Sequence, residues 1–208
     1  MFRNLLKPDS GLMITMNWIT DCIFLSLFWI LGCIPVVTVA TSFAALYDSA
    51  FKTYRAGEKH GWQRFWRVYR DNWKAGILPS VAVLVVFGVV LFGEIAFWNR
   101  AVAGEISFLL FAASAFLAVL VLGILSLVCP ILSRFENGFL GILRNSFLLG
   151  LANLPRTLLL GMLNALTVIL CAKYVFPLFF LPALSALIGS IFIEKMFKPF
   201  MPGEEAAE

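Results

Sequence analysis

The sequence predicts an all-α protein, a polytopic integral membrane helical bundle with five to six transmembrane helices and cytoplasmic interfacial amphipathic helices. The first observation behind this prediction is a run of 28 residues without a charged side chain, Ile106–Ser133. The second is composition, because 61% of the residues are hydrophobic and 13% are charged, whereas an average soluble domain carries about 25% charge. A membrane span needs roughly 20 apolar residues at about 1.5 Å each, so this run is long enough to cross a bilayer.

Apolar segments occupy most of the chain, and neither of the longer polar intervals is large enough to bury a hydrophobic core of its own. We therefore expect a single membrane domain over residues 1–208. The two polar intervals, residues 48–76 and 134–156, are predicted to be loops on the same side of the membrane. The predicted apolar segments are residues 18–47, 77–97, 106–132, 157–172 and 174–193.

The first apolar segment admits two interpretations. Its uncharged part, Cys22–Tyr47, would extend about 39 Å as one helix against a hydrocarbon core of about 30 Å, and Pro35 lies at its middle. In one alternative a single tilted, kinked helix crosses once and leaves the amino terminus outside. In the other, Gly32–Pro35 is a turn between two helices, residues 12–33 and 36–55. The second alternative gives six spans, which the charges favour because it places two further cations inside: Arg3 and Lys7.

The net charge of +4 is concentrated in one interval. Cytoplasmic loops of membrane proteins are enriched in Lys and Arg, so this interval is predicted to be cytoplasmic. Threading the spans from there puts the 134–156 interval and the carboxyl terminus on the same side. The basic residues of the first interval are Lys52, Arg55, Lys59, Arg64, Arg67, Arg70 and Lys74.

Within that interval, residues 60–74 combine aromatic and basic side chains at helical spacing. In one interpretation this helix lies flat at the interface, with its rings at headgroup depth and its cations facing anionic lipid phosphates. In the other it packs its aromatic face on the bundle. Stacking on single-stranded nucleic acid also uses such residues, but a membrane flanks the segment closely on both sides, so we expect no nucleic-acid partner. The candidate contact residues are Trp62, Arg64, Phe65, Trp66, Arg67, Tyr69, Arg70, Trp73 and Lys74.

The second polar interval reads as a short helix that Pro155 should end by denying it a backbone donor. Its charged and polar residues could anchor the chain at the membrane surface or contact a partner, and the anchoring interpretation is favoured. These candidates are Arg134, Glu136, Asn137 and Arg156. Ionisable or strongly polar groups inside spans are few, and the candidates there are Asp21 and Asn164.

Residue patterns typical of enzymes are missing from the sequence. His60 is the only histidine, which leaves almost nothing from which to build a histidine metal site or a Ser-His-Asp triad. The four cysteines are isolated within apolar runs, and no phosphate-binding Gly-rich loop with Lys-Ser/Thr is present. We therefore expect no catalytic residue, no cofactor and no metal ion.

Four stretches of the chain resemble the YesL-like family of uncharacterised bacterial integral membrane proteins. They are residues 1–10, residues 35–47 with Pro35-Val36-Val37-Thr38, residues 65–74 with Phe65-Trp66 and Asn72-Trp73-Lys74, and residues 134–156 with Arg134-Phe135-Glu136-Asn137. A glycine usual after the Pro-x-x-Thr motif is replaced by Ala40. The resemblance implies a multi-pass protein of the bacterial cytoplasmic membrane that accompanies carbohydrate uptake, and it supplies no catalytic residues.

Two functional hypotheses follow. The first is a non-catalytic accessory to carbohydrate uptake or its regulation, which contacts anionic lipid headgroups or components of a carbohydrate ABC transporter at the cytoplasmic face. The second is a small transporter or channel for a sugar-related solute or an ion. A continuous polar pathway through Asn164 and Thr41 would favour transport, whereas a dry, tightly packed bundle would favour the accessory role.

Overall fold

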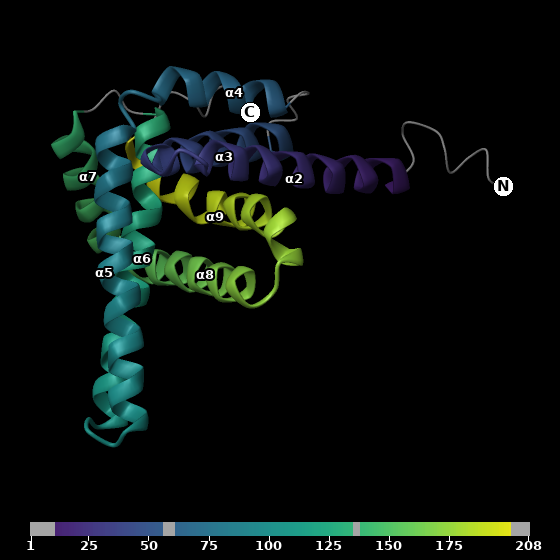
Figure 1. The fold of residues 1–208 in the computed structure, drawn as a ribbon. Coiled ribbons are helices and arrows are strands. Elements are labelled where there is room, and N and C mark those ends of the chain that lie inside the picture. The colour runs from purple at the N-terminus through teal and green to yellow at the C-terminus, as the bar shows by residue number, and fades with distance from the viewer. Residues whose placement is uncertain (1–10, 56–60, 135–137, 201–208) are drawn as a thin grey trace.

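The protein is built from helices, as Figure 1 shows. The computed structural model describes residues 11–55, 61–134 and 138–200, and no β-strand occurs among them. Short 3₁₀ helices occupy Val36–Thr38, Phe176–Phe179 and Lys198–Phe200. The α-helices are α2 (Gly11–Cys33), α3 (Val39–Tyr54), α4 (Gly61–Asn72), α5 (Ile77–Val102), α6 (Phe108–Arg134), α7 (Phe139–Ala152), α8 (Leu154–Lys173) and α9 (Leu181–Phe197).

The longest helices, α5 and α6, form an antiparallel hairpin that extends beyond the other elements in Figure 1. They contain 26 and 27 residues, which corresponds to about 40 Å each. The turn between them passes through Gly104, whose φ of 75° is a left-handed conformation that favours glycine. In the same view α2 and α3 lie together across one end of the hairpin, with α4 outside them.

Three helices in the described part of the chain are long and apolar enough to cross a membrane: α5, α6 and α8. This finding agrees with the predicted membrane character. The predicted total of five to six spans stays a prediction. The described side chains of α2, Ile19–Cys33, form a shorter apolar stretch. The predicted segment 174–193 differs from the structure, because a 3₁₀ turn containing Pro177 delays the start of α9 to Leu181.

The first apolar segment is divided at Pro35 into two helices. A proline lacks the backbone donor that would continue α2, so the chain turns through Val36–Thr38 before α3 begins. The Thr38 hydroxyl donates hydrogen bonds to the carbonyls of Pro35 at 2.7 Å and Gly32 at 3.0 Å. These bonds tie the turn together, and α2 and α3 pack against each other beyond it.

Helix α3 is the centre of the fold. It contacts α2, α4, α5, α6 and α9. Small side chains make these contacts possible, because Ala40, Ala44, Ala45 and Ala50 are each 0% exposed. One side of α3 shares a core with Leu127 and other residues of α6 and α9, and the other side shares a core with α2 and α4.

Helices α6 and α8 approach each other backbone to backbone through glycines. A Cβ atom placed on Gly161 would overlap the carbonyl oxygen of Val119, and one placed on Gly123 would overlap that of Thr157. Small residues of this kind are what allow close helix contacts in membranes, where packing replaces the hydrophobic effect as the driving force.

Gly161→Ala should therefore destabilise the protein by about 1–3 kcal/mol, because the two helices must move apart to admit the methyl group. Thermal unfolding in detergent or in vesicles measures this loss. The matched control is Gly88→Ala on α5, where an added Cβ would meet nothing within 4 Å. Equal unfolding temperatures for the two variants would contradict the proposed role of Gly161.

Candidate functional site

Helix α4 is attached to the rest of the protein by part of its aromatic face. Phe65 is 0% exposed, and its ring stacks on those of Phe28 and Tyr69, with both centroid distances 6.2 Å. The Tyr69 hydroxyl donates to Thr38 Oγ1 at 3.1 Å, at the turn between α2 and α3. These contacts fix both the position and the rotation of α4.

The remaining aromatic residues of α4 and the residue that follows it are partly exposed. Trp62, Trp66 and Trp73 are 48%, 39% and 46% exposed. They line an open groove that also includes Arg67 and Arg70. Lys74, just after the helix, lies 5.8 Å from the centre of the Trp73 ring. Each of the two interpretations from the sequence therefore describes part of the aromatic face. Phe65 and Tyr69 pack inward, the Trp66 ring packs edge-on against Phe28 of α2 while staying partly exposed, and Trp62 and Trp73 are open to the surroundings.

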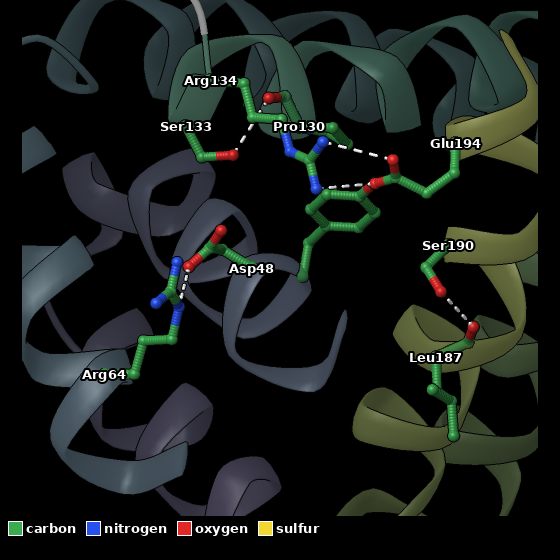
Figure 2. Close-up of polar contacts among 9 residues, drawn as sticks. Asp48, Arg64, Pro130, Ser133, Arg134, Leu187, Ser190 and Glu194 are labelled. Atoms are coloured by element: carbon green, nitrogen blue, oxygen red, sulfur yellow. Dashed lines mark hydrogen bonds and ion pairs between the residues drawn. The ribbon is translucent and has the colours of Figure 1, made fainter. Parts of the chain in front are cut away.

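Arg64 has a different role from its basic neighbours. Its Nε donates to Asp48 Oδ2 on α3 at 2.5 Å, and the Asp48 side chain is only 8% exposed (Figure 2). Because this pair joins α3 to α4, Arg64 acts as a structural anchor of the helix and is held apart from the outward cations Arg67 and Arg70.

A second ion pair joins α6 to α9 on the other side of α3. Arg134 Nη2 lies 2.8 Å from Glu194 Oε1, and Nη1 donates to Oε2 at 3.2 Å, so the guanidinium engages both carboxylate oxygens (Figure 2). The Tyr47 hydroxyl of α3 donates to the same carboxylate at 2.6 Å. The Arg134 guanidinium also lies 4.8 Å from the centre of the Phe51 ring. Three helices are thus joined at one point.

The segments predicted to share one side of the membrane do meet in space. Arg156, at the start of α8, donates to the carbonyl of Lys195 at 3.1 Å, near the end of α9. Together with the Arg134–Glu194 pair, this contact gathers the start of α8 and the ends of α6 and α9. Two further candidates, Glu136 and Asn137, lie outside the described residues.

The two intramembrane candidates are in different surroundings. Asp21 is half-buried on α2, beside Cys22, whose sulfur accepts a hydrogen bond from the Tyr54 hydroxyl at 3.1 Å. Asn164 lies on α8, where its amide donates to Ser126 Oγ at 2.9 Å and to the Leu160 carbonyl at 2.8 Å. The structure does not bring Asp21 and Asn164 into a common site.

Fold and site together describe a helical protein with three candidate membrane spans, whose charged contacts gather at one end of the α5–α6 hairpin. Residues 22–95 match the model of a family described as "Protein of unknown function, DUF624". The matched stretch runs from within α2 through most of α5 and includes all of α3 and α4. No curated protein and no solved structure matches the chain.

Sequence reasoning missed the acidic partners of the two ion pairs. Asp48 and Glu194 each follow directly on an uncharged run, at the boundary where a charge is usually read as a solvated helix end. A signal was present, because each stands at the end of a predicted span that the threading places on the same side as the predicted cytoplasmic arginines. Tyr47 gave no such signal, since a tyrosine beside an apolar run is typical of the membrane interface.

Replacing Glu194 by Gln should destabilise the protein, because Arg134, whose side chain is 8% exposed, would lose its counter-charge. Breaking a buried ion pair costs about 3–5 kcal/mol, and we expect a value at the lower end of this range. Thermal unfolding of the purified full chain measures the change. Glu105→Gln, an exposed acid at the far turn of the hairpin, is the matched control and should have little effect. Removing both Arg134 and Glu194 should cost less than the sum of the single changes.

Proposed function

We propose that this chain is a non-catalytic, multi-pass protein of the bacterial cytoplasmic membrane, of the YesL-like kind, that serves as an accessory to carbohydrate uptake or its regulation. Its working surface is the outward face of α4, which contacts anionic lipid headgroups or a subunit of a carbohydrate transporter. The observation that carries the proposal is the division of α4, because one set of side chains fixes it to α2 and α3 while three tryptophans and adjacent cations stay exposed.

The chemistry of that outward face suits a lipid surface. Tryptophan rings favour the headgroup region, where an apolar body and an N–H donor are both accommodated. Each cation near an anionic leaflet contributes on the order of 1 kcal/mol. Among the described residues, Arg67, Arg70 and Lys74 are the exposed cations on α4 or directly after it, while Arg64 is engaged with Asp48. The positive-inside bias of residues 48–76 supports a cytoplasmic position for α4, and the carboxyl terminus follows it to that side.

A small transporter or channel is the second candidate, and a cavity between the helices favours it. The cavity has a volume of about 320 Å³ and includes Asn164 and Ser126 in its wall. Thr41 is not among its lining residues, and most of the wall is apolar. A sugar pathway needs hydrogen-bonding groups for many hydroxyls, so the composition of the wall favours the accessory role. Flux of an oligosaccharide or an ion across vesicles containing the purified protein would favour transport instead.

The triple change Arg67→Gln, Arg70→Gln and Lys74→Gln should reduce selectivity for anionic lipid, because three attractions of about 1 kcal/mol are removed. The measurement is the ratio of spin-labelled phosphatidylglycerol to spin-labelled phosphatidylcholine immobilised by the protein in vesicles. Arg100→Gln, at the far end of α5, is the control and should leave the ratio unchanged. A triple variant with unaltered selectivity at low salt would rule out the lipid contact.

The tryptophans should decide whether a protein partner is retained. Purification from native membranes in mild detergent should recover carbohydrate-transporter subunits with the wild type and lose them with Trp62→Ala and Trp66→Ala combined. Exposed aromatic residues are enriched among the residues that dominate binding energy at protein interfaces. Trp98→Ala, an equally exposed tryptophan on α5, is the control. Recovery of no transporter subunit with the wild type would contradict the accessory role.

A further inference from the structure

The cavity between the helices is separate from the α4 surface and has a composition of its own. Six helices contribute to its wall, namely α2, α3, α5, α6, α8 and α9. Its volume of about 320 Å³ lies within the range of roughly 300–1,000 Å³ that is typical of ligand sites. No lining residue is charged, and the apolar part of the wall includes Val83, Phe87, Leu122 and Val168. Such a wall suits a hydrocarbon chain and disfavours an ion or a free sugar.

Polar groups are present at a few positions of this wall. The Asn164 amide nitrogen donates both to Ser126 Oγ and to the Leu160 carbonyl, and no donor among the described residues is hydrogen-bonded to its Oδ1 atom. Trp29 also lines the cavity, and its buried Nε1–H has no hydrogen-bond partner among the described residues. Leaving a buried donor unpaired costs about 1–3 kcal/mol, a cost that a ligand oxygen would remove if it reached Nε1.

We propose that this cavity binds one uncharged amphiphile, a hydrocarbon chain that carries a hydroxyl or carbonyl oxygen. The chain lies against the apolar wall, and the oxygen accepts from Trp29 Nε1 or, where it is a hydroxyl, donates to Asn164 Oδ1. A free long-chain alcohol and the ester end of a bilayer lipid tail share this chemistry. The site is independent of α4, so it does not depend on the lipid or transporter contacts proposed for that helix.

The test uses the full chain in phospholipid vesicles and 12-bromododecan-1-ol, whose bromine quenches tryptophan fluorescence on contact. The wild type should show quenching that saturates with alcohol concentration, and Trp29→Phe should lose the saturating part. Val168→Phe, which fills the cavity, should lose it as well. Val85→Phe makes the same substitution on the exposed face of α5, where the side chain is 59% exposed, and should behave as the wild type.

A second comparison is insensitive to misfolding of the filled variant. The wild type should bind 12-bromododecan-1-ol more tightly than 1-bromododecane, and Asn164→Leu, which keeps the size of the side chain, should weaken that preference while still binding the alkane. Vesicles with bromine on the phospholipid tails separate the two sources. A full plateau from these vesicles alone assigns the site to bilayer lipid, and a plateau that needs the alcohol assigns it to a free amphiphile. Quenching that rises without saturation and equally in the wild type, Val168→Phe and Val85→Phe would overturn the proposal.

Discussion

The small volume of the side chains on α3 is the constraint on which the structure depends. Alanines on opposite sides of this helix are fully buried, so neighbouring helices pack against its backbone at close range. Ala40 and Ala44 belong to the core shared with α6 and α9, and Ala45 and Ala50 belong to the core shared with α2 and α4. Because lipid tails are as apolar as leucine, close packing of this kind holds helices together in a membrane where hydrophobicity alone would not.

The carboxyl-terminal half of α3 carries two side chains that contact charged residues of neighbouring helices. Tyr47 and Asp48 are neighbours in sequence and point to different partners, because successive residues on a helix lie about 100° apart. Tyr47 reaches the carboxylate of Glu194, and Asp48 reaches Arg64. A single turn of helix thereby fixes α9 on one side and α4 on the other. The exposed face of α4 is oriented by the Asp48–Arg64 pair together with the inward packing of Phe65 and Tyr69.

Much of this fold follows from the sequence, and the parts that do not have physical reasons. The length and apolar character of α5, α6 and α8 identify candidate spans directly, and Pro35 marks a break because it lacks a backbone donor. The predicted start of the last helix was too early. Residues 174–180 are uncharged and apolar, like the helix that follows, but Pro177 prevents them from joining it. Helical periodicity placed the aromatic residues of α4 on one face. Only the position of α2 shows that Phe65 is covered and Trp62 is not.

The outer part of the α5–α6 hairpin extends past the remaining helices (Figure 1). A Cβ atom added at Gly88 or Gly93 would meet nothing within 4 Å, which shows how open this part of α5 is. Helices that exceed the local hydrocarbon thickness accommodate the mismatch chiefly by tilting. In a thinner or thicker bilayer, the protruding end of the α5–α6 hairpin can tilt while the contacts of α3 at the opposite end keep their geometry. Membrane thickness would then alter the slope of the hairpin without reaching the surface presented by α4.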